Sequence, residues 1–178
     1  MPFLAVLVAA PSPSASLPQV IRATMDQEYP GWKLAPVTPQ IQQAFKKHHA
    51  DRLASLTYGD FDHDGKRDYA VQIAITTPGQ EEQIVIVFLA RGNGYEENIL
   101  ESMGLDPSVY LWVANKALTE TGPNGQDKLV NKDILMVLGS PAGPATYAFD
   151  EGKLQEIKTQ EDSEHPDPSL PRPSATVL

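Results

Sequence analysis

The segment Gln83-Ile84-Val85-Ile86-Val87-Phe88-Leu89-Ala90-Arg91 is apolar at nearly every position. In a β-strand, successive side chains point to opposite faces of the sheet, so the odd and even positions of this segment form two separate faces. Both faces are apolar here. The segment therefore predicts a central strand that is covered on both sides.

Further strand candidates lie on both sides of this segment, and turn residues separate them. They are residues 71–75, 95–100, 109–113, 134–138, 145–149 and 154–158. Apolar and smaller or polar residues alternate over 71–75, which predicts a half-buried strand. Gly92-Asn93-Gly94 and Asp150-Glu151-Gly152-Lys153 have the composition of tight turns and predict two hairpins. A polar loop is expected at residues 119–127.

Two segments ahead of the strands have the periodicity of helices. Residues 17–29 carry apolar side chains at intervals of three and four, and Pro30-Gly31 ends the pattern. Thr38-Pro39 supplies a cap and a first-turn proline for a second helix that ends near Ala50. The order of helix, helix and many strands predicts an α+β fold, with the N-terminal helices packed on one side of a mainly antiparallel β-sheet.

The domain boundaries follow from composition. A single α+β domain is expected over residues 17–160, and residues 161–178, which are acidic and rich in proline, predict a disordered tail. Residues 1–16 contain the apolar run Phe3 to Ala10, which is too short to span a bilayer. We interpret residues 1–16 as the remainder of a signal peptide, although a basic leader is missing, and a buried strand is the alternative. No transmembrane segment is expected elsewhere.

The charge of the chain restricts its partners. Fourteen Lys and Arg residues stand against 23 Asp and Glu residues, which gives a formal net charge of -9 at pH 7. No nucleic-acid partner is therefore expected, whereas cations such as metal ions are favoured. The absence of cysteine excludes disulfides, thiolate nucleophiles and cysteine-ligated zinc.

An acidic loop is expected just before residues 71–75. Residues 60–68 read Asp-Phe-Asp-His-Asp-Gly-Lys-Arg-Asp, so carboxylates alternate and Gly65 permits a sharp bend. Two unit charges 4 Å apart repel by about 4 kcal/mol at an effective dielectric near 20, so a divalent cation would relieve the loop. Calcium takes six to eight oxygen ligands. The predicted calcium (Ca²⁺) ligands are Asp60, Asp62, Asp64, the main-chain carbonyl of Lys66, and Asp68, the last directly or through water.

This loop resembles that of a known family. Residues 59–71, Gly-Asp-Phe-Asp-His-Asp-Gly-Lys-Arg-Asp-Tyr-Ala-Val, are similar to the Asp-x-Asp-x-Asp-Gly-x-x-Asp calcium loop of FG-GAP and VCBS-type repeats. Such repeats are found in integrin β-propellers and in many bacterial exported proteins. The resemblance covers one copy of the loop, so it implies a calcium site and does not imply a propeller.

Two alternatives concern the metal. An EF-hand needs an acidic residue at the twelfth loop position followed by a helix, whereas Val71 and a predicted strand occupy these places. Without that carboxylate, calcium affinity should be weak, roughly 10⁻⁴ to 10⁻³ M, which suits an extracytoplasmic site. The second alternative is an acidic Asp-Gly turn that binds no ion.

The expected function follows from the loop and from the motifs around it. The sequence contains no nucleophile motif, phosphate-binding loop or transition-metal cluster that would predict catalytic residues. We expect a calcium-binding extracytoplasmic domain, periplasmic or secreted, in which the metal is mainly structural. It would act as a binding or interaction module whose partner is another protein or a surface glycan. The alternative is a small hydrolase with a structural calcium site.

Overall fold

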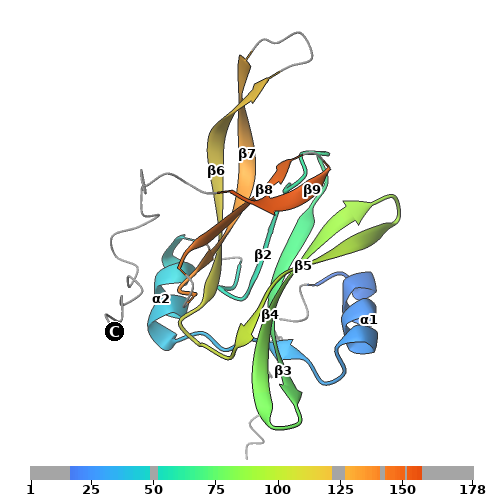
Figure 1. The fold of residues 1–178 in the computed structure, drawn as a ribbon, viewed down its shortest axis with the longest axis vertical. Helices are drawn as coiled ribbons and strands as arrows, with labels where there is room; N and C mark the ends of the chain where they lie inside the picture. Colours follow the sequence, from blue (N-terminus) through green and yellow to red (C-terminus); the bar gives the residue numbers. More distant parts are fainter. Residues whose placement is uncertain (1–16, 49–51, 122–126, 141–142, 151, 158–178) are drawn as a thin grey trace, which may run out of the picture.

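The computed structural model of the chain describes residues 17–48, 52–121, 127–140, 143–150 and 152–157, which form two antiparallel β-sheets and two helices (Figure 1). The elements are α1 Gln19–Glu28, β1 Lys33–Leu34, α2 Pro39–His48, β2 Leu56–Gly59, β3 Asp68–Thr77, β4 Gln80–Arg91, β5 Gly94–Gly104, β6 Tyr110–Thr121, β7 Asp127–Leu138, β8 Ala145–Asp150 and β9 Lys153–Glu156. The expected signal-peptide remainder at 1–16 and the expected tail at 161–178 lie outside the described residues. Within the described ranges, no helix is long and apolar enough to cross a membrane.

The first sheet is built around β4. Its strand order is β1, β3, β4 and β5, and β2 also pairs with β3. All residues of β4 from Gln83 to Ala90 are buried, and β3 and β5 pair with it on its two edges. The prediction of a central strand covered on both faces is therefore confirmed.

The second sheet is an antiparallel meander in the order β6, β7, β8 and β9. β6 and β7 pair over their full length, from Tyr110 opposite Leu138 to Thr121 opposite Asp127. β8 pairs only with residues 135–137 of β7, so the distal half of the β6–β7 hairpin extends beyond the other strands (Figure 1). The sequence predicts one sheet, and the structure has two, because the chain leaves the first sheet after Gly104 and starts a new one at Tyr110.

A hydrophobic core lies between the two sheets. It contains buried residues from β3, β4, β6, β7 and β8, the residue before β6 and one residue of the acidic loop: Phe61, Ala70, Val85, Val87, Leu89, Val109, Leu111, Leu135, Val137, Ala145 and Tyr147. Burying apolar area at about 25 cal/mol per Å² is the main stabilising contribution in such a core. The loop is therefore attached to the core through the Phe61 side chain.

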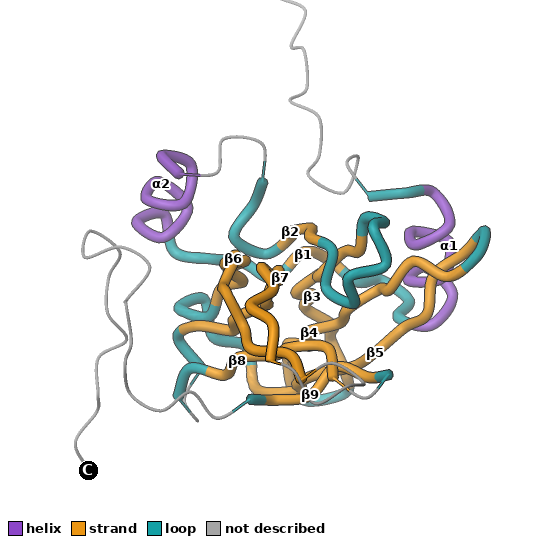
Figure 2. The backbone as a smooth tube through the Cα atoms, turned by 90° about the horizontal axis from the view of Figure 1, so that it is seen from above, coloured by secondary structure: helices purple, strands orange, loops and turns teal. Residues whose placement is uncertain are grey.

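The two helices contact different clusters. Ile21 and Met25 of α1 are buried with residues of β3 and β4 on the face of the first sheet opposite the inter-sheet core. Ile41 and Phe45 of α2 are buried with Trp112 of β6 and other residues of the second sheet. The helices lie at opposite ends of the molecule (Figure 2).

The ends of the helices follow the predicted signals. α1 ends at Glu28, and the amide of its C-cap, Tyr29, donates a hydrogen bond of 2.9 Å to the carbonyl of Met25. Pro30 follows, and Gly31 has a φ of 81°, a left-handed conformation that glycine adopts at little steric cost. At the start of α2, the amide of Ile41 donates a hydrogen bond of 3.3 Å to the Thr38 hydroxyl, and Pro39 is the first helical residue. Thr38 is therefore an N-cap, as the sequence predicts.

Candidate metal site

The acidic loop connects β2 to β3. These strands are antiparallel neighbours, and the last residue of β2, Gly59, pairs with the first residue of β3, Asp68. The pairing brings the two ends of the loop together, so Asp60 and Asp68 are close in space although they are eight positions apart.

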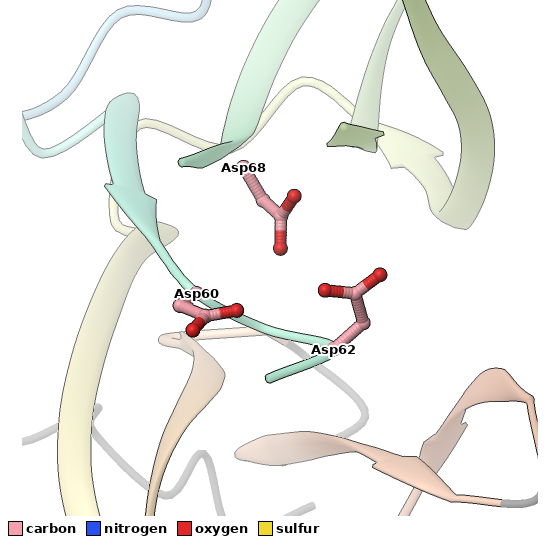
Figure 3. A group of neighbouring side chains, drawn as sticks. All are labelled: Asp60, Asp62 and Asp68. Carbon is pink, nitrogen blue, oxygen red and sulfur yellow. The ribbon is translucent and has the colours of Figure 1, made fainter. Parts of the chain in front are cut away.

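Three of the loop carboxylates form a group. One oxygen from each of Asp60, Asp62 and Asp68 lies within 4.8 Å of the corresponding oxygens of the other two, and the three side chains point toward a common centre (Figure 3). Asp60 and Asp62 are partly buried, and Asp68 is fully buried. The loop therefore concentrates negative charge at a point with restricted access to water.

Asp68 anchors the loop to the first sheet. Its Oδ2 accepts a hydrogen bond of 2.7 Å from the amide of Phe61, and its Oδ1 accepts one of 2.8 Å from the amide of Ala90 in β4. Burial raises the pKa of Asp68 to about 6, and these backbone hydrogen bonds oppose the increase. Asp68 thus ties the start of the loop to the end of β4.

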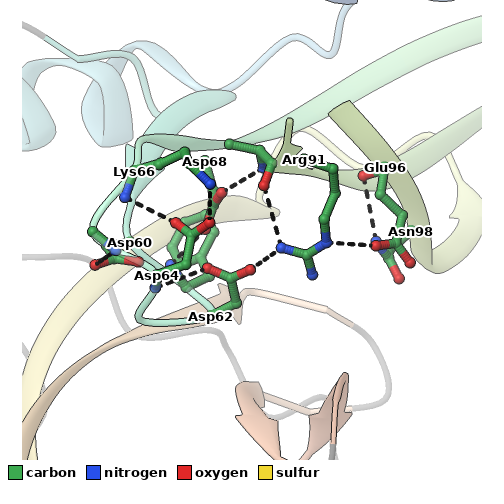
Figure 4. Close-up of polar contacts among 11 residues, drawn as sticks. Asp60, Asp62, Asp64, Lys66, Asp68, Arg91, Glu96 and Asn98 are labelled. Carbon is green, nitrogen blue, oxygen red and sulfur yellow. Dashed lines mark hydrogen bonds and ion pairs between the residues drawn. The ribbon is translucent and has the colours of Figure 1, made fainter. Parts of the chain in front are cut away.

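Asp62 forms an ion pair with an arginine of the protein. Its Oδ2 forms an ion pair with the guanidinium of Arg91, and its Oδ1 accepts a hydrogen bond of 3.3 Å from the amide of Asp64 (Figure 4). Arg91 also donates a hydrogen bond of 2.9 Å to Glu96. Arg91 therefore neutralises part of the charge of the loop.

Asp60 has one oxygen that lacks a partner. Its Oδ2 accepts a hydrogen bond of 3.0 Å from the amide of Gly65. Its Oδ1 is buried and has no hydrogen-bond partner in the described part of the chain. An unsatisfied buried acceptor costs about 1 to 3 kcal/mol, and more when it is charged, so this oxygen favours a cation beside it.

Asp64 and Lys66 lie apart from this group. The Lys66 ammonium contacts Asp64 Oδ2 at 2.6 Å, and the Lys66 amide donates a hydrogen bond of 2.9 Å to Asp64 Oδ1. These hydrogen bonds from Lys66 lower the pKa of Asp64. Of the predicted side-chain ligands, the structure brings Asp60, Asp62 and Asp68 together and places the Asp64 carboxylate against Lys66 instead.

The backbone of the loop bends at two residues. Gly65 has a φ of 82°, which agrees with the sharp bend expected there. His63 has a φ of 62°, which is uncommon for a residue with a side chain. Its Nε2 is buried and has no hydrogen-bond partner among the described residues.

Sequence reasoning missed three residues that fix the loop, one within it and two from other strands. Phe61 of the loop places its side chain in the inter-sheet core, and Arg91 lies at the end of β4. Asp133 of β7 accepts a hydrogen bond of 3.1 Å from the amide of Asp60, and its other oxygen accepts one of 3.0 Å from Asn115. The role of Phe61 could have been predicted, because it is an apolar residue between two acids. The roles of Arg91 and Asp133 depend on tertiary pairing and have no local signal.

No protein-family model matches the chain, and neither a curated protein nor a solved structure matches it. The fold and the acidic loop define a strand-rich domain with a candidate cation site. Its function is therefore argued from the chemistry of the residues in the loop.

Proposed function

We propose that the protein is a calcium-binding domain in which the loop of residues 60–68 holds one structural Ca²⁺. The observation that carries this proposal is that Asp60, whose carboxylate groups with those of Asp62 and Asp68, has a buried oxygen, Oδ1, without a partner among the described residues. A hard cation with oxygen ligands is the partner that such a group attracts.

The spacing of the oxygens is compatible with calcium. Ca²⁺ binds oxygen at about 2.3 to 2.6 Å, so ligands on opposite sides of the ion lie roughly 4.6 to 5.2 Å apart. The oxygens of the group lie within 4.8 Å of one another, so they can surround Ca²⁺ with little movement. The Lys66 carbonyl and the Asp64 carboxylate are the expected additional ligands.

The proposed affinity is weak. Arg91 forms an ion pair with Asp62, so Ca²⁺ has to compete with a guanidinium for this ligand. The twelfth loop position is Val71, which supplies no carboxylate. An affinity of roughly 10⁻⁴ to 10⁻³ M follows, and such a site is filled in calcium-rich surroundings outside the cytoplasm. We therefore propose an extracytoplasmic, periplasmic or secreted, location.

The metal would act as a cross-link in a chain without cysteine. The loop contacts the first sheet through Asp68 and Ala90, and it contacts the second sheet through Asp60 and Asp133. An ion among Asp60, Asp62 and Asp68 would hold these attachments together. This structural role, together with the likeness of the loop to FG-GAP and VCBS-type repeats, favours a module that binds a protein or a surface glycan over a small hydrolase.

Calorimetric titration of the full chain with calcium tests the proposal. We expect one site with an affinity of roughly 10⁻⁴ to 10⁻³ M. Asp60→Asn should abolish binding because it removes the charge of the unpartnered oxygen. Glu81→Gln, which removes one negative charge from an exposed position of β4, should bind as the wild type does. Absence of binding to the wild type, or equal binding by Asp60→Asn, would contradict the proposal.

A further inference from the structure

The distal part of the β6–β7 hairpin extends beyond the other strands (Figure 1). β6 and β7 pair in one continuous register up to Thr121 opposite Asp127, whereas β8 pairs with β7 only at residues 135–137. A two-stranded hairpin on its own is at best marginally stable in water. A further strand paired with this part of the hairpin would therefore stabilise it.

The outer edge of β6 carries main-chain groups that point away from the hairpin. Among the described residues, β7 is the only strand that pairs with β6. The amide of Leu111 donates a hydrogen bond of 2.7 Å to the carbonyl of Ala54, so the main-chain groups of Leu111 point away from β7. These directions alternate along an antiparallel strand, and the register of β6 with β7 does not shift. The groups of Ala117 and Thr119 therefore also point outward, and within the described part of the chain they have no main-chain partner.

This edge is complementary to a second copy of itself. When two identical strands pair antiparallel, a two-fold axis relates them, and the positions pair around one central residue. With Leu118 at the centre, Ala117 of each copy lies opposite Thr119 of the other, so outward main-chain groups meet. The same register places Lys116 opposite Glu120 twice. Cross-strand pairs of opposite charge stabilise a sheet.

Other registers of the same two strands are less favourable. A centre between two residues would place outward main-chain groups opposite inward ones. A centre at Lys116 or Glu120 would place like charges opposite each other, which is destabilising. A centre at residue 117 or 119 would leave both charged residues opposite uncharged ones. Leu118 is therefore the centre, within residues 116–120, that suits both the main chain and the charges.

The position of this edge also limits the repulsion between two copies. Each chain has a formal net charge of -9, which opposes contact between the main bodies of two copies. Val113 of β6 still packs against the inter-sheet core. Leu118 lies five residues beyond it, which is about 17 Å along a strand, so the two cores would be roughly 34 Å apart. This separation exceeds the Debye length of about 8 Å at physiological ionic strength.

We propose that the outer edge of β6 over residues 116–120 is an interface between two copies of this chain, which pair antiparallel about Leu118. The second sheet has four strands, so the two copies together form one sheet of eight strands. An interface of this length is small, so the dimer is weak and forms at high protein concentration. It contains no residue of the acidic loop and does not depend on calcium.

Sedimentation of the full chain over a range of protein concentrations, in EDTA and at constant ionic strength, tests this dimer. We expect the sedimentation coefficient to rise with concentration from that of a monomer to that of a dimer. Lys116→Glu and Glu120→Lys each place like charges opposite one another twice, so each should weaken the dimer by at least about tenfold. The double variant restores the pairs of opposite charge and should dimerise as the wild type does. A wild type that stays monomeric at all concentrations, or single variants that dimerise equally well, would overturn the proposal.

Two further measurements separate this register from general charge attraction. In an equimolar mixture of Lys116→Glu and Glu120→Lys, every acidic position of one copy faces a basic position of the other, so mixed dimers should form. Thr119→Pro removes an outward amide that makes no hydrogen bond to β7, so the hairpin should remain while the dimer is lost. Absence of mixed dimers, or a wild-type dimer affinity in Thr119→Pro, would refute the interface. Unfolding midpoints verify that each variant is folded.

Discussion

Arg91, the last residue of β4, forms an ion pair with Asp62, one of the three acids that converge in the loop (Figure 4). The side chain of Asp62 is 3% exposed, so the guanidinium neutralises a carboxylate that water hardly reaches. The same carboxylate is a proposed ligand of Ca²⁺. The guanidinium of Arg91 would therefore compete with the proposed Ca²⁺ for this carboxylate.

Removal of this internal competitor should strengthen calcium binding. We expect Arg91→Gln to raise the calcium affinity by about fivefold, since a partly exposed ion pair contributes up to about 1 kcal/mol. Lys33→Gln is the control, because it removes one positive charge from an exposed position of β1 outside the loop. Calorimetric titration measures both variants. An unchanged affinity in Arg91→Gln, or an equal gain in Lys33→Gln, would mean that Arg91 does not compete with the ion for Asp62.

The stability of the metal-free protein should depend on the protonation of Asp68. Burial raises the pKa of Asp68 to about 6 in the folded chain, whereas an unfolded aspartate has a pKa of about 4. Between these values the folded state binds more protons than the unfolded state. The contribution of Asp68 to stability is therefore fully present below pH of about 4, falls as the pH rises, and is lost above about 6.

Urea unfolding in EDTA at several pH values measures this effect. The fall in the free energy of unfolding should amount to at most roughly 3 kcal/mol. Asp68→Asn remains neutral at every pH, so the difference between the wild type and this variant should change over the same interval. Parallel curves for the two proteins between pH 4 and 7, an interval that brackets about 4 to 6, would show that Asp68 does not titrate there.

Asp68 and Asp64 should differ strongly when each is truncated. Asp68→Ala leaves the buried amides of Phe61 and Ala90 without their acceptor, so we expect the free energy of unfolding to fall by about 3 to 5 kcal/mol in EDTA. Asp64→Ala removes an exposed carboxylate that contacts Lys66, and it should leave the stability of the metal-free protein nearly unchanged. Chemical denaturation of both variants compares them. Similar losses would argue against Asp68 as the anchor of the loop.

Local sequence patterns predicted the strands of the fold better than their assembly. Residues 83–91 were identifiable as a central strand because both faces of that strand are buried, and burial imposes apolar side chains on both. The strand expected at residues 109–113 is the first part of the longer β6, Tyr110–Thr121. The end of β6, residues 119–121, falls in the segment 119–127 that the sequence predicts as a loop, and only tertiary pairing with β7 reveals it as strand. The division into two sheets has no local signal.

The candidate site shows the same limit. The spacing of the aspartates predicted that Asp60, Asp62, Asp64 and Asp68 converge. The structure brings three of them together and leaves Asp64 against Lys66, because the pairing of β2 with β3 joins the two ends of the loop. The spacing did not predict that Arg91 and Asp133 complete the surroundings. These residues lie in β4 and β7, and their approach to the loop depends on strand register and on the packing of the two sheets.

The approach of the second sheet to the loop requires a glycine at position 59. A Cβ atom built at Gly59 would lie 2.8 Å from a ring carbon of Phe61 and 3.1 Å from Oδ2 of Asp133. Asp133 Oδ2 accepts the hydrogen bond from Asp60, and Phe61 is buried in the inter-sheet core, so neither neighbour can move freely. We therefore expect Gly59→Ala to lower the free energy of unfolding by about 1 to 3 kcal/mol, the usual cost of overpacking.

A matched glycine separates this steric effect from the general effect of replacing glycine by alanine. Gly104, the last residue of β5, has no atom within 4 Å of a Cβ built on it. Gly104→Ala should be neutral or should stabilise the protein by up to about 1 kcal/mol, because alanine reduces the entropy of the unfolded chain. Urea unfolding compares the stabilities of the two variants. Calcium titration of Gly59→Ala should also reveal weaker binding, because the alanine side chain displaces the contact of Asp60 with Asp133. Equal stabilities of the two variants would show that the loop tolerates a side chain at position 59 and that its contact with the second sheet is looser than the 3.1 Å hydrogen bond indicates.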